Sequence, residues 1–274
     1  MSEPANPFTD PTLIAGDLYG APIRLQQRTQ SLHTAKIAGA SAADTIIELA
    51  TATTRRPQVV CDIGCGRGTT TRRLATDLRP RLLVALDQSA ALLAVTAQRV
   101  RADGYPVTPV RADFHALPFP DSSLDLVIAA FCLYHSTRPH IPIAEIARCL
   151  HPDGRAILVT KSADSYHELD DLLAETGIDP HATTRPGLYE TFHSTTAAPI
   201  TAPLLPIIDI VEQRHEFRFA GLAQVAEYLV TSPKYVLPPP LATTAALAAA
   251  LRRRVPDNTV HTSSTLTYVV AGPR

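Results

Sequence analysis

Three glycines at alternate positions follow an apolar run that has an acid next to its last residue. The run spans residues 59–63 with Asp62 near its end, and the glycines are Gly64, Gly66 and Gly68. A glycine has no Cβ, so a backbone of this kind can turn tightly and approach a ligand closely. A helix starting after the last glycine would add backbone N–H groups that no helical carbonyl uses. The pattern therefore predicts a turn that cradles a nucleotide.

The glycine spacing and the acid narrow the kind of nucleotide. Dinucleotide-binding folds use Gly-x-Gly-x-x-Gly to receive a pyrophosphate, and the third glycine of that pattern would stand at Thr69 (64 plus 5). The Asp62 carboxylate would repel a pyrophosphate, whereas it would attract a ligand that presents an amino group. The residues thus favour a nucleotide with an amino group over a dinucleotide.

The acid-x-Gly-x-Gly-x-Gly turn resembles the first motif of the class I S-adenosylmethionine-dependent methyltransferases. The chain is most similar to their small-molecule branch, related to quinone-biosynthesis methyltransferases. Two later runs, 117–127 and 145–154, resemble the family's approaches to its fourth and fifth strands. Two positions depart from the family pattern, because Asp153 replaces a usual glycine and Arg67 a usual small residue. Neither position belongs to the chemistry that the resemblance implies.

The resemblance implies that S-adenosylmethionine is the cofactor. Asp87 ends the second expected strand 19 positions after Gly68 (87 minus 68), where its carboxylate can accept hydrogen bonds from the ribose hydroxyls. Asp113 and Phe114 match the pair that binds the adenine amino group and packs on the ring. The expected cofactor-binding residues are Tyr19, Asp62, Gly64, Cys65, Gly66, Gly68, Thr69, Asp87, Gln88, Asp113, Phe114 and Ala130.

Acceptor residues are expected after the fourth and fifth strands, and they are Phe131, Tyr134, His135 and Lys161. His135 is the candidate catalytic base because an imidazole titrates near neutral pH. Packing or capping is its alternative role. For Tyr19, we weigh a ring face over the sulfonium against a surface anchor for the amino-terminal arm. No metal site is expected.

Strand and helix patterns alternate around these residues. Apolar runs predict strands at 58–63, 82–86, 107–111, 124–131 and 156–160, with helices at 69–78, after Ser89 and around 143–150. A helix at 164–175, a proline-punctuated loop, a strand at 207–219, helices near 222–229 and 241–254 and a closing strand at 265–270 follow. This order predicts an α/β fold, a Rossmann-like seven-stranded, mostly parallel sheet with helices on both faces and a helical lid.

The domain prediction divides the chain into two parts. Residues 1–57 are expected to form an N-terminal arm and cap helices, with 29–50 helical. Residues 58–274 are expected to form the methyltransferase core, with a lid insertion at about 220–262.

Composition limits the partners. Lys+Arg number 25 against 26 Asp+Glu, a formal net charge of -1, so no overall positive field would attract nucleic acid. No run reaches the roughly 18 apolar residues of a membrane span. The cysteines lack paired spacing and are expected to be reduced thiols, and the expected location is cytoplasmic. A homodimer is left open.

Three lysines against twenty-two arginines, with abundant alanine, are typical of GC-rich bacterial genomes. By that association we expect a small-molecule acceptor from natural product biosynthesis, a specialised metabolite. Alternatives are a methyltransferase acting on RNA, DNA or protein, a nicotinamide-dependent oxidoreductase, and a module that binds the cofactor without turnover. The first would need a basic face or an added binding module.

Overall fold

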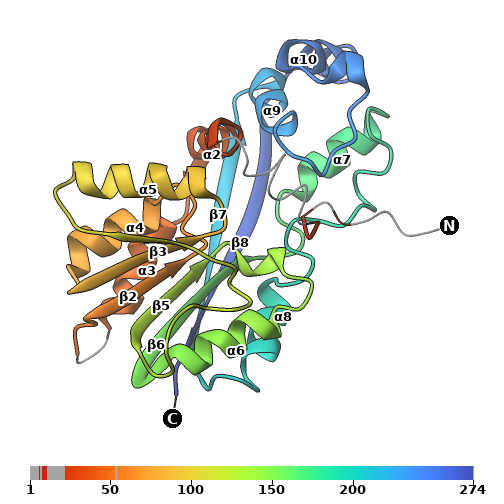
Figure 1. Cartoon of the computed structure of the whole chain (residues 1–274). Coiled ribbons are helices and arrows are strands. Elements are labelled where there is room, and N and C mark those ends of the chain that lie inside the picture. Colours follow the sequence, from red (N-terminus) through yellow and green to blue (C-terminus); the bar gives the residue numbers. More distant parts are fainter. Residues whose placement is uncertain (1–5, 7, 11–21, 53–54, 274) are drawn as a thin grey trace. The chain divides into compact units, whose positions relative to one another are not determined.

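The computed structural model describes residues 6, 8–10, 22–52 and 55–273 (Figure 1). Tyr19, and with it the predicted contact to a sulfonium, lies outside these residues. Among the helices of the described residues, none has the length and apolar character needed to span a membrane.

The described chain contains a sheet with the strand order β1-β7-β8-β6-β5-β2-β3-β4. The pairs β2–β3, β2–β5, β3–β4 and β5–β6 are parallel, whereas β6–β8 and β1–β7 are antiparallel. The strands are β1 (Lys36–Ala38), β2 (Val59–Ile63), β3 (Leu82–Asp87), β4 (Thr108–Arg111), β5 (Leu124–Ala130), β6 (Leu150–Lys161), β7 (Ile207–Phe219) and β8 (Val260–Ala271). The mostly parallel α/β sheet confirms the predicted Rossmann-like fold.

The helices alternate with the strands in the first half of the chain and cluster between strands in the second half. They are α2 (Pro22–Ala35), α3 (Ala42–Thr51), α4 (Thr69–Arg73), α5 (Ala90–Ala102), α6 (His140–Cys149), α7 (His167–Glu175), α8 (Ser194–Thr201), α9 (Leu222–Leu229) and α10 (Thr244–Arg252). A π-helical turn, Leu74–Leu78, continues α4, so the two together occupy the predicted helix 69–78.

The chain forms two compact units. The motif unit, residues 40–162, 191–212 and 266–274, contains the glycine motif. Its strands β2, β3 and β5 and residues 156–159 of β6 are mostly apolar and buried on both faces, as central parallel strands are. Helices α3, α4 and α5 cover one face, and α6 and α8 cover the other (Figure 1). One core cluster joins Ile46 of α3 and Leu93 of α5 to strand residues such as Val60 and Ile128.

The helical unit comprises residues 1–39, 163–190 and 213–265. Its core packs Tyr166, the residue before α7, against aromatic residues of β7 and α9, with the Tyr166 ring centroid 5.4 Å from that of Phe217 and 5.8 Å from that of Tyr228. Two buried acids are neutralised there, Asp179 by Arg185 at 2.6 Å and Asp170 by Lys234 at 2.5 Å. The unit therefore has a core of its own, with charges paired inside it.

Two elements correct the sequence-based expectations. The sheet has eight strands instead of seven, because Lys36–Ala38 forms β1 inside the predicted helix 29–50. Helix α2 ends at Ala35, and Gly39, which follows β1 with φ +99°, lies against the buried ring of His215 in β7. Helix α8 lies in the predicted proline-punctuated loop; its Pro199 is inside the helix, and the His193 N–H donates to Thr196 Oγ1 at its start.

Gly39 and Gly177 offer a matched test of that close contact. Both have a positive φ, but an added Cβ at Gly39 would lie 2.4 Å from the His215 ring, whereas at Gly177 it would meet nothing within 4 Å. Backbone strain of about 1–2 kcal/mol applies to both alanine variants, and overpacking adds about 1–3 kcal/mol at Gly39 alone. Urea denaturation should therefore show a larger loss of stability for Gly39→Ala than for Gly177→Ala; equal losses would contradict the contact.

Candidate functional site

Residues 64–68 form the predicted turn between β2 and α4. All three glycines have positive φ angles, +63° at Gly64, +55° at Gly66 and +75° at Gly68. The N–H of Cys65 donates to the Leu86 carbonyl at 3.0 Å, and the hydroxyl of Thr96 donates to the Gly66 carbonyl at 2.8 Å. These bonds to β3 and α5 fix the shape of the turn within the protein itself.

The three glycines differ in what stands beside them. A Cβ added at Gly64 would lie 2.5 Å from the Cys132 Cβ, and one at Gly68 would lie 2.7 Å from Thr96. At Gly66 the nearest described atom would be 3.9 Å away. Packing therefore requires glycine at the outer two positions, while Gly66 faces open space where a ligand could approach the backbone.

Asp62 lies inside the motif unit and is only 2% exposed. The hydroxyl of Thr71 donates to its carboxylate at 2.6 Å. Burial, together with the nearby charge of Asp87, raises the pKa of Asp62 to about 7, although the Thr71 hydrogen bond works in the opposite direction. A direct contact between Asp62 and a cofactor stays a prediction. In the structure, a ligand could interact with Asp62 through the charge of its carboxyl group.

Asp87 ends β3 and holds two backbone turns. Its Oδ2 accepts from the Gly66 N–H and its Oδ1 from the Ser89 N–H, both at 2.9 Å. Burial raises the pKa of Asp87 above its ordinary value, although these bonds and one from the Gln88 backbone lower it. A carboxylate has about four acceptor positions, so this arrangement leaves acceptor capacity for the predicted ribose hydroxyls.

Asp113 and Phe114 follow β4, as the sequence predicts. Asp113 Oδ1 accepts from the His115 backbone N–H at 2.9 Å and lies 2.7 Å from the ring nitrogen Nδ1 of His115. Burial acts to raise the pKa of Asp113, but the His115 hydrogen bonds leave it below its ordinary value. Phe114 stacks on the His115 ring with centroids 4.6 Å apart. Sequence reasoning missed His115, whose only signal is its position beside this pair.

Phe131 and Lys161 meet after β5 and at the end of β6. The Lys161 ammonium lies 5.6 Å from the Phe131 ring centroid, a cation–π distance. Phe131 has a left-handed backbone with φ +59°, and its N–H donates to the Val159 carbonyl at 2.9 Å. Such a conformation is uncommon for a bulky residue and tends to occur at functional sites. The structure thus brings two predicted acceptor residues together.

Tyr134 and His135 lie on a 3-10 turn, Leu133–His135. Tyr134 is only 4% exposed, and its carbonyl accepts from the Thr191 hydroxyl at 2.8 Å. His135 is half-buried and its ring meets the Tyr134 ring edge-on at 4.6 Å. Of the two, His135 is therefore the side chain better placed to reach a ligand.

Three further predicted cofactor residues differ in exposure. Ala130 is the half-buried last residue of β5, and Thr69 is the exposed first residue of α4. Burial raises the pKa of the Cys65 thiol, which keeps the thiol neutral.

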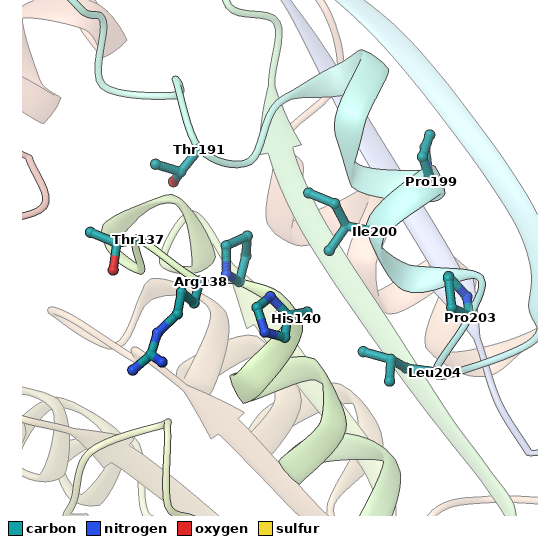
Figure 2. A pocket seen from close by; sticks show the side chains of 9 residues that line it. Thr137, Arg138, His140, Thr191, Pro199, Ile200, Pro203 and Leu204 are labelled. Atoms are coloured by element: carbon teal, nitrogen blue, oxygen red, sulfur yellow. The ribbon is translucent and has the colours of Figure 1, made fainter.

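A separate cavity of about 380 Å³ lies between the start of α6 and the region of α8 (Figure 2). Ile200 and Leu204 line it from one side and His140 faces them from the other (Figure 2). The sequence analysis missed this cavity, and none of the predicted site residues lines it.

Comparison with known proteins identifies a domain within the chain. Residues 60–154, which hold the glycine turn, Asp87 and Asp113, match the family described as a methyltransferase domain. The chain carries a methyltransferase domain. This match agrees with the sequence-based expectation of a methyltransferase that uses S-adenosylmethionine.

Curated relatives of the methyltransferase domain share about half of the chain. A malonyl-[acyl-carrier protein] O-methyltransferase of Halorhodospira halophila is 33% identical over 138 residues, covering 49% of this chain and 45% of the relative. A ubiquinone/menaquinone biosynthesis C-methyltransferase UbiE of Cupriavidus metallidurans is 34% identical, covering 42% and 47%. The chain thus spans about half the length of the curated relatives it matches.

Solved structures extend the similarity over the whole chain, at the level of the fold. The crystal structure of the [4+2]-cyclase SpnF matches with a TM-score of 0.59 and 20% identity, covering 99% of this chain and 98% of that one.

Asp62 should give the stability of the methyltransferase domain a pH dependence. Its folded pKa of about 7 exceeds the ordinary value of 3.8. Between these values the folded state keeps a proton that the unfolded state has lost, so this contribution to stability falls as pH rises toward 7.

The measurement compares the wild type with Asp62→Asn by urea denaturation at pH 4.5, 6 and 8. The stability advantage of the wild type should shrink by about 3 kcal/mol across this range. Asp153→Asn, which removes an exposed carboxylate, is the control and should show little change. A constant difference for Asp62→Asn would refute the raised pKa.

Proposed function

We propose that this protein transfers a methyl group from S-adenosylmethionine to a small-molecule acceptor, a specialised metabolite. The observation that carries the proposal is the glycine turn, which bonds of the protein hold in shape while the Gly66 position faces open space. The names of two curated relatives, a malonyl-[acyl-carrier protein] O-methyltransferase and a ubiquinone/menaquinone biosynthesis C-methyltransferase, support the small-molecule part of the proposal and not its specialised-metabolite part.

Each strand end would hold one part of the cofactor. When bound, S-adenosylmethionine supplies a methyl group already activated by its sulfonium. Gly66 admits the cofactor close to the backbone, and the buried carboxylate of Asp62 favours its positive charge. Asp87 would accept from the ribose hydroxyls, and Asp113, with Phe114, would hold the adenine.

The acceptor side supplies orientation and, where needed, a base. Positioning a nucleophile can lower a barrier by about 7 kcal/mol or more, so the residues that hold the acceptor matter most. Phe131 and Lys161 offer an apolar face and a cation at one edge of the sheet. His135 would accept the proton when the acceptor is a hydroxyl, and it would be dispensable for an enolate or a neutral amine.

Calorimetric titration of the purified protein with S-adenosylmethionine and with NAD tests cofactor choice. We expect binding of the former alone, and binding of NAD alone would refute the proposal. Because a [4+2]-cyclase shares this fold, binding must be joined to turnover, measured as S-adenosylhomocysteine released with a panel of phenols, carboxylates, amines and quinols. A matched panel of RNA and protein substrates tests the alternative acceptors, and release with these alone would replace the small molecule.

Gly66→Val should lower the affinity for S-adenosylmethionine at least tenfold, because its side chain fills the space that the ligand needs. Gly104→Val is the matched control. Gly104 also has a positive φ, +84°, and an added Cβ there would meet no described atom within 4 Å. Both variants carry similar backbone strain, so unchanged affinity in Gly66→Val would count against the turn as the binding site.

His135→Ala should lower kcat while leaving the affinity for S-adenosylmethionine unchanged, since the imidazole is proposed to act on the acceptor. The measurement is kcat against pH with an acceptor found in the panel, and loss of the rising limb near neutral pH is the expected sign of a missing base. His167→Ala, an exposed histidine of the helical unit, is the control. Full activity in His135→Ala would assign the residue to packing.

A further inference from the structure

Three hydrogen bonds form a series between the residues that follow β4 and the loop that follows β5, and one of them, between His115 and Ser136, joins the two segments. His115 Nδ1 lies 2.7 Å from Asp113 Oδ1, and His115 Nε2 lies 2.7 Å from Ser136 Oγ. The same Ser136 oxygen accepts the backbone N–H of Arg138 at 3.0 Å. All four residues belong to the motif unit. The imidazole therefore bridges two loops that lie more than twenty residues apart in the sequence.

The chemistry of the partners assigns the direction of each bond. Asp113, whose pKa is lowered, is an acceptor only, so His115 Nδ1 carries the hydrogen and donates it. Nε2 is then the acceptor and takes the hydroxyl hydrogen of Ser136, which in turn accepts from Arg138. Each donor has one acceptor in this assignment, and every bond points toward Asp113. Bonds aligned in one direction polarise and strengthen one another.

One end of this series of hydrogen bonds is buried, whereas the other end is partly exposed. Ser136 is 1% exposed, so its hydroxyl is held inside the protein. The side chain of His115 is 34% exposed and that of Asp113 is 56% exposed. Stacking on Phe114 with ring planes 23° apart restrains the imidazole further. The carboxylate of Asp113 is therefore oriented from a buried anchor, with part of it open to a ligand.

A backbone turn alone would not explain the arrangement. The bond from the His115 backbone N–H to Asp113 already closes a local turn without any side chain at position 115. The two ring bonds are additional, and both carboxylate and hydroxyl partners use specific nitrogens of the imidazole. This set of contacts depends on the side chain of histidine and on Ser136 together.

We propose that His115, anchored by Ser136, is a positioning residue that orients Asp113 to select a 6-amino purine. The inference rests on the proposed function, in which Asp113 accepts from the adenine amino group. A carboxylate held in this way accepts from a 6-amino group and meets a 6-oxo group with repulsion between two acceptors. His115 thus sets the selectivity of the site for adenine over hypoxanthine, beyond any general effect on cofactor affinity.

The test measures the affinities for S-adenosylhomocysteine and S-inosylhomocysteine by calorimetry. The wild type should prefer the adenine compound. His115→Phe keeps a ring against Phe114 but loses both hydrogen bonds, and the preference should fall about tenfold. Ser136→Ala, which removes only the anchor, and His115→Asn, which can still donate to Asp113, should each retain part of the preference. His151→Ala, at a half-buried histidine of β6, should retain all of it.

The ratio of the two affinities separates this role from a structural one. An equal loss of both affinities in His115→Phe, with the ratio kept, would overturn the proposal and make His115 a packing residue. An unchanged ratio in all variants that bind S-adenosylhomocysteine would also overturn it, while the proposed function would stand. If the wild type bound neither compound, the proposed function would fail first and this inference with it.

Discussion

The Asp87 carboxylate accepts two backbone N–H groups, one from the glycine turn and one from the start of α5. Much of the site depends on these bonds, because they join the end of β3 to the loop that follows β2. The Thr96 hydroxyl holds the other side of the same turn through the Gly66 carbonyl. A loop with three left-handed glycines would otherwise lose much conformational entropy on binding. Here the turn becomes ordered when the protein folds, so the proposed ligand binds to a turn that already has its shape.

The same carboxylate also contributes to the electrostatics of the site. Asp62 and Asp87 are both largely buried, and the charge of Asp87 helps to raise the pKa of Asp62. Two acids in a region of low dielectric favour a ligand of positive charge and disfavour a pyrophosphate. A cation bound there would lower the pKa of Asp62 and release its proton near neutral pH. The preference for a positively charged ligand that Asp62 alone indicates is therefore stronger with the neighbouring acid included.

The sequence predicted the parts of the fold that depend on local patterns. Apolar runs located the parallel strands, and the glycine spacing located the turn, because both properties are carried by neighbouring residues. Strand β1 and helix α8 could not be found in this way. The first depends on pairing with β7, which is far away in the chain, and the second holds a proline that local rules assign to a loop. The Ser136 anchor of His115 was hidden for the same reason.

The register of the parallel strands explains why the predicted residues come together. Ile63 pairs with both Leu86 and Ala129, and Asp87 pairs with Arg111, so β2, β3, β4 and β5 end at nearly the same level. The glycine turn, Asp87, Asp113 and Phe131 therefore follow one edge of the sheet. Strands that are apolar on both faces gain little register information from burial, since a slip exchanges one apolar side chain for another. Hydrogen bonds just beyond the strand ends supply this register information. They run from the Cys65 N–H to the Leu86 carbonyl and from the Phe131 N–H to the Val159 carbonyl. The loops that carry the site thus also align the strands that position it.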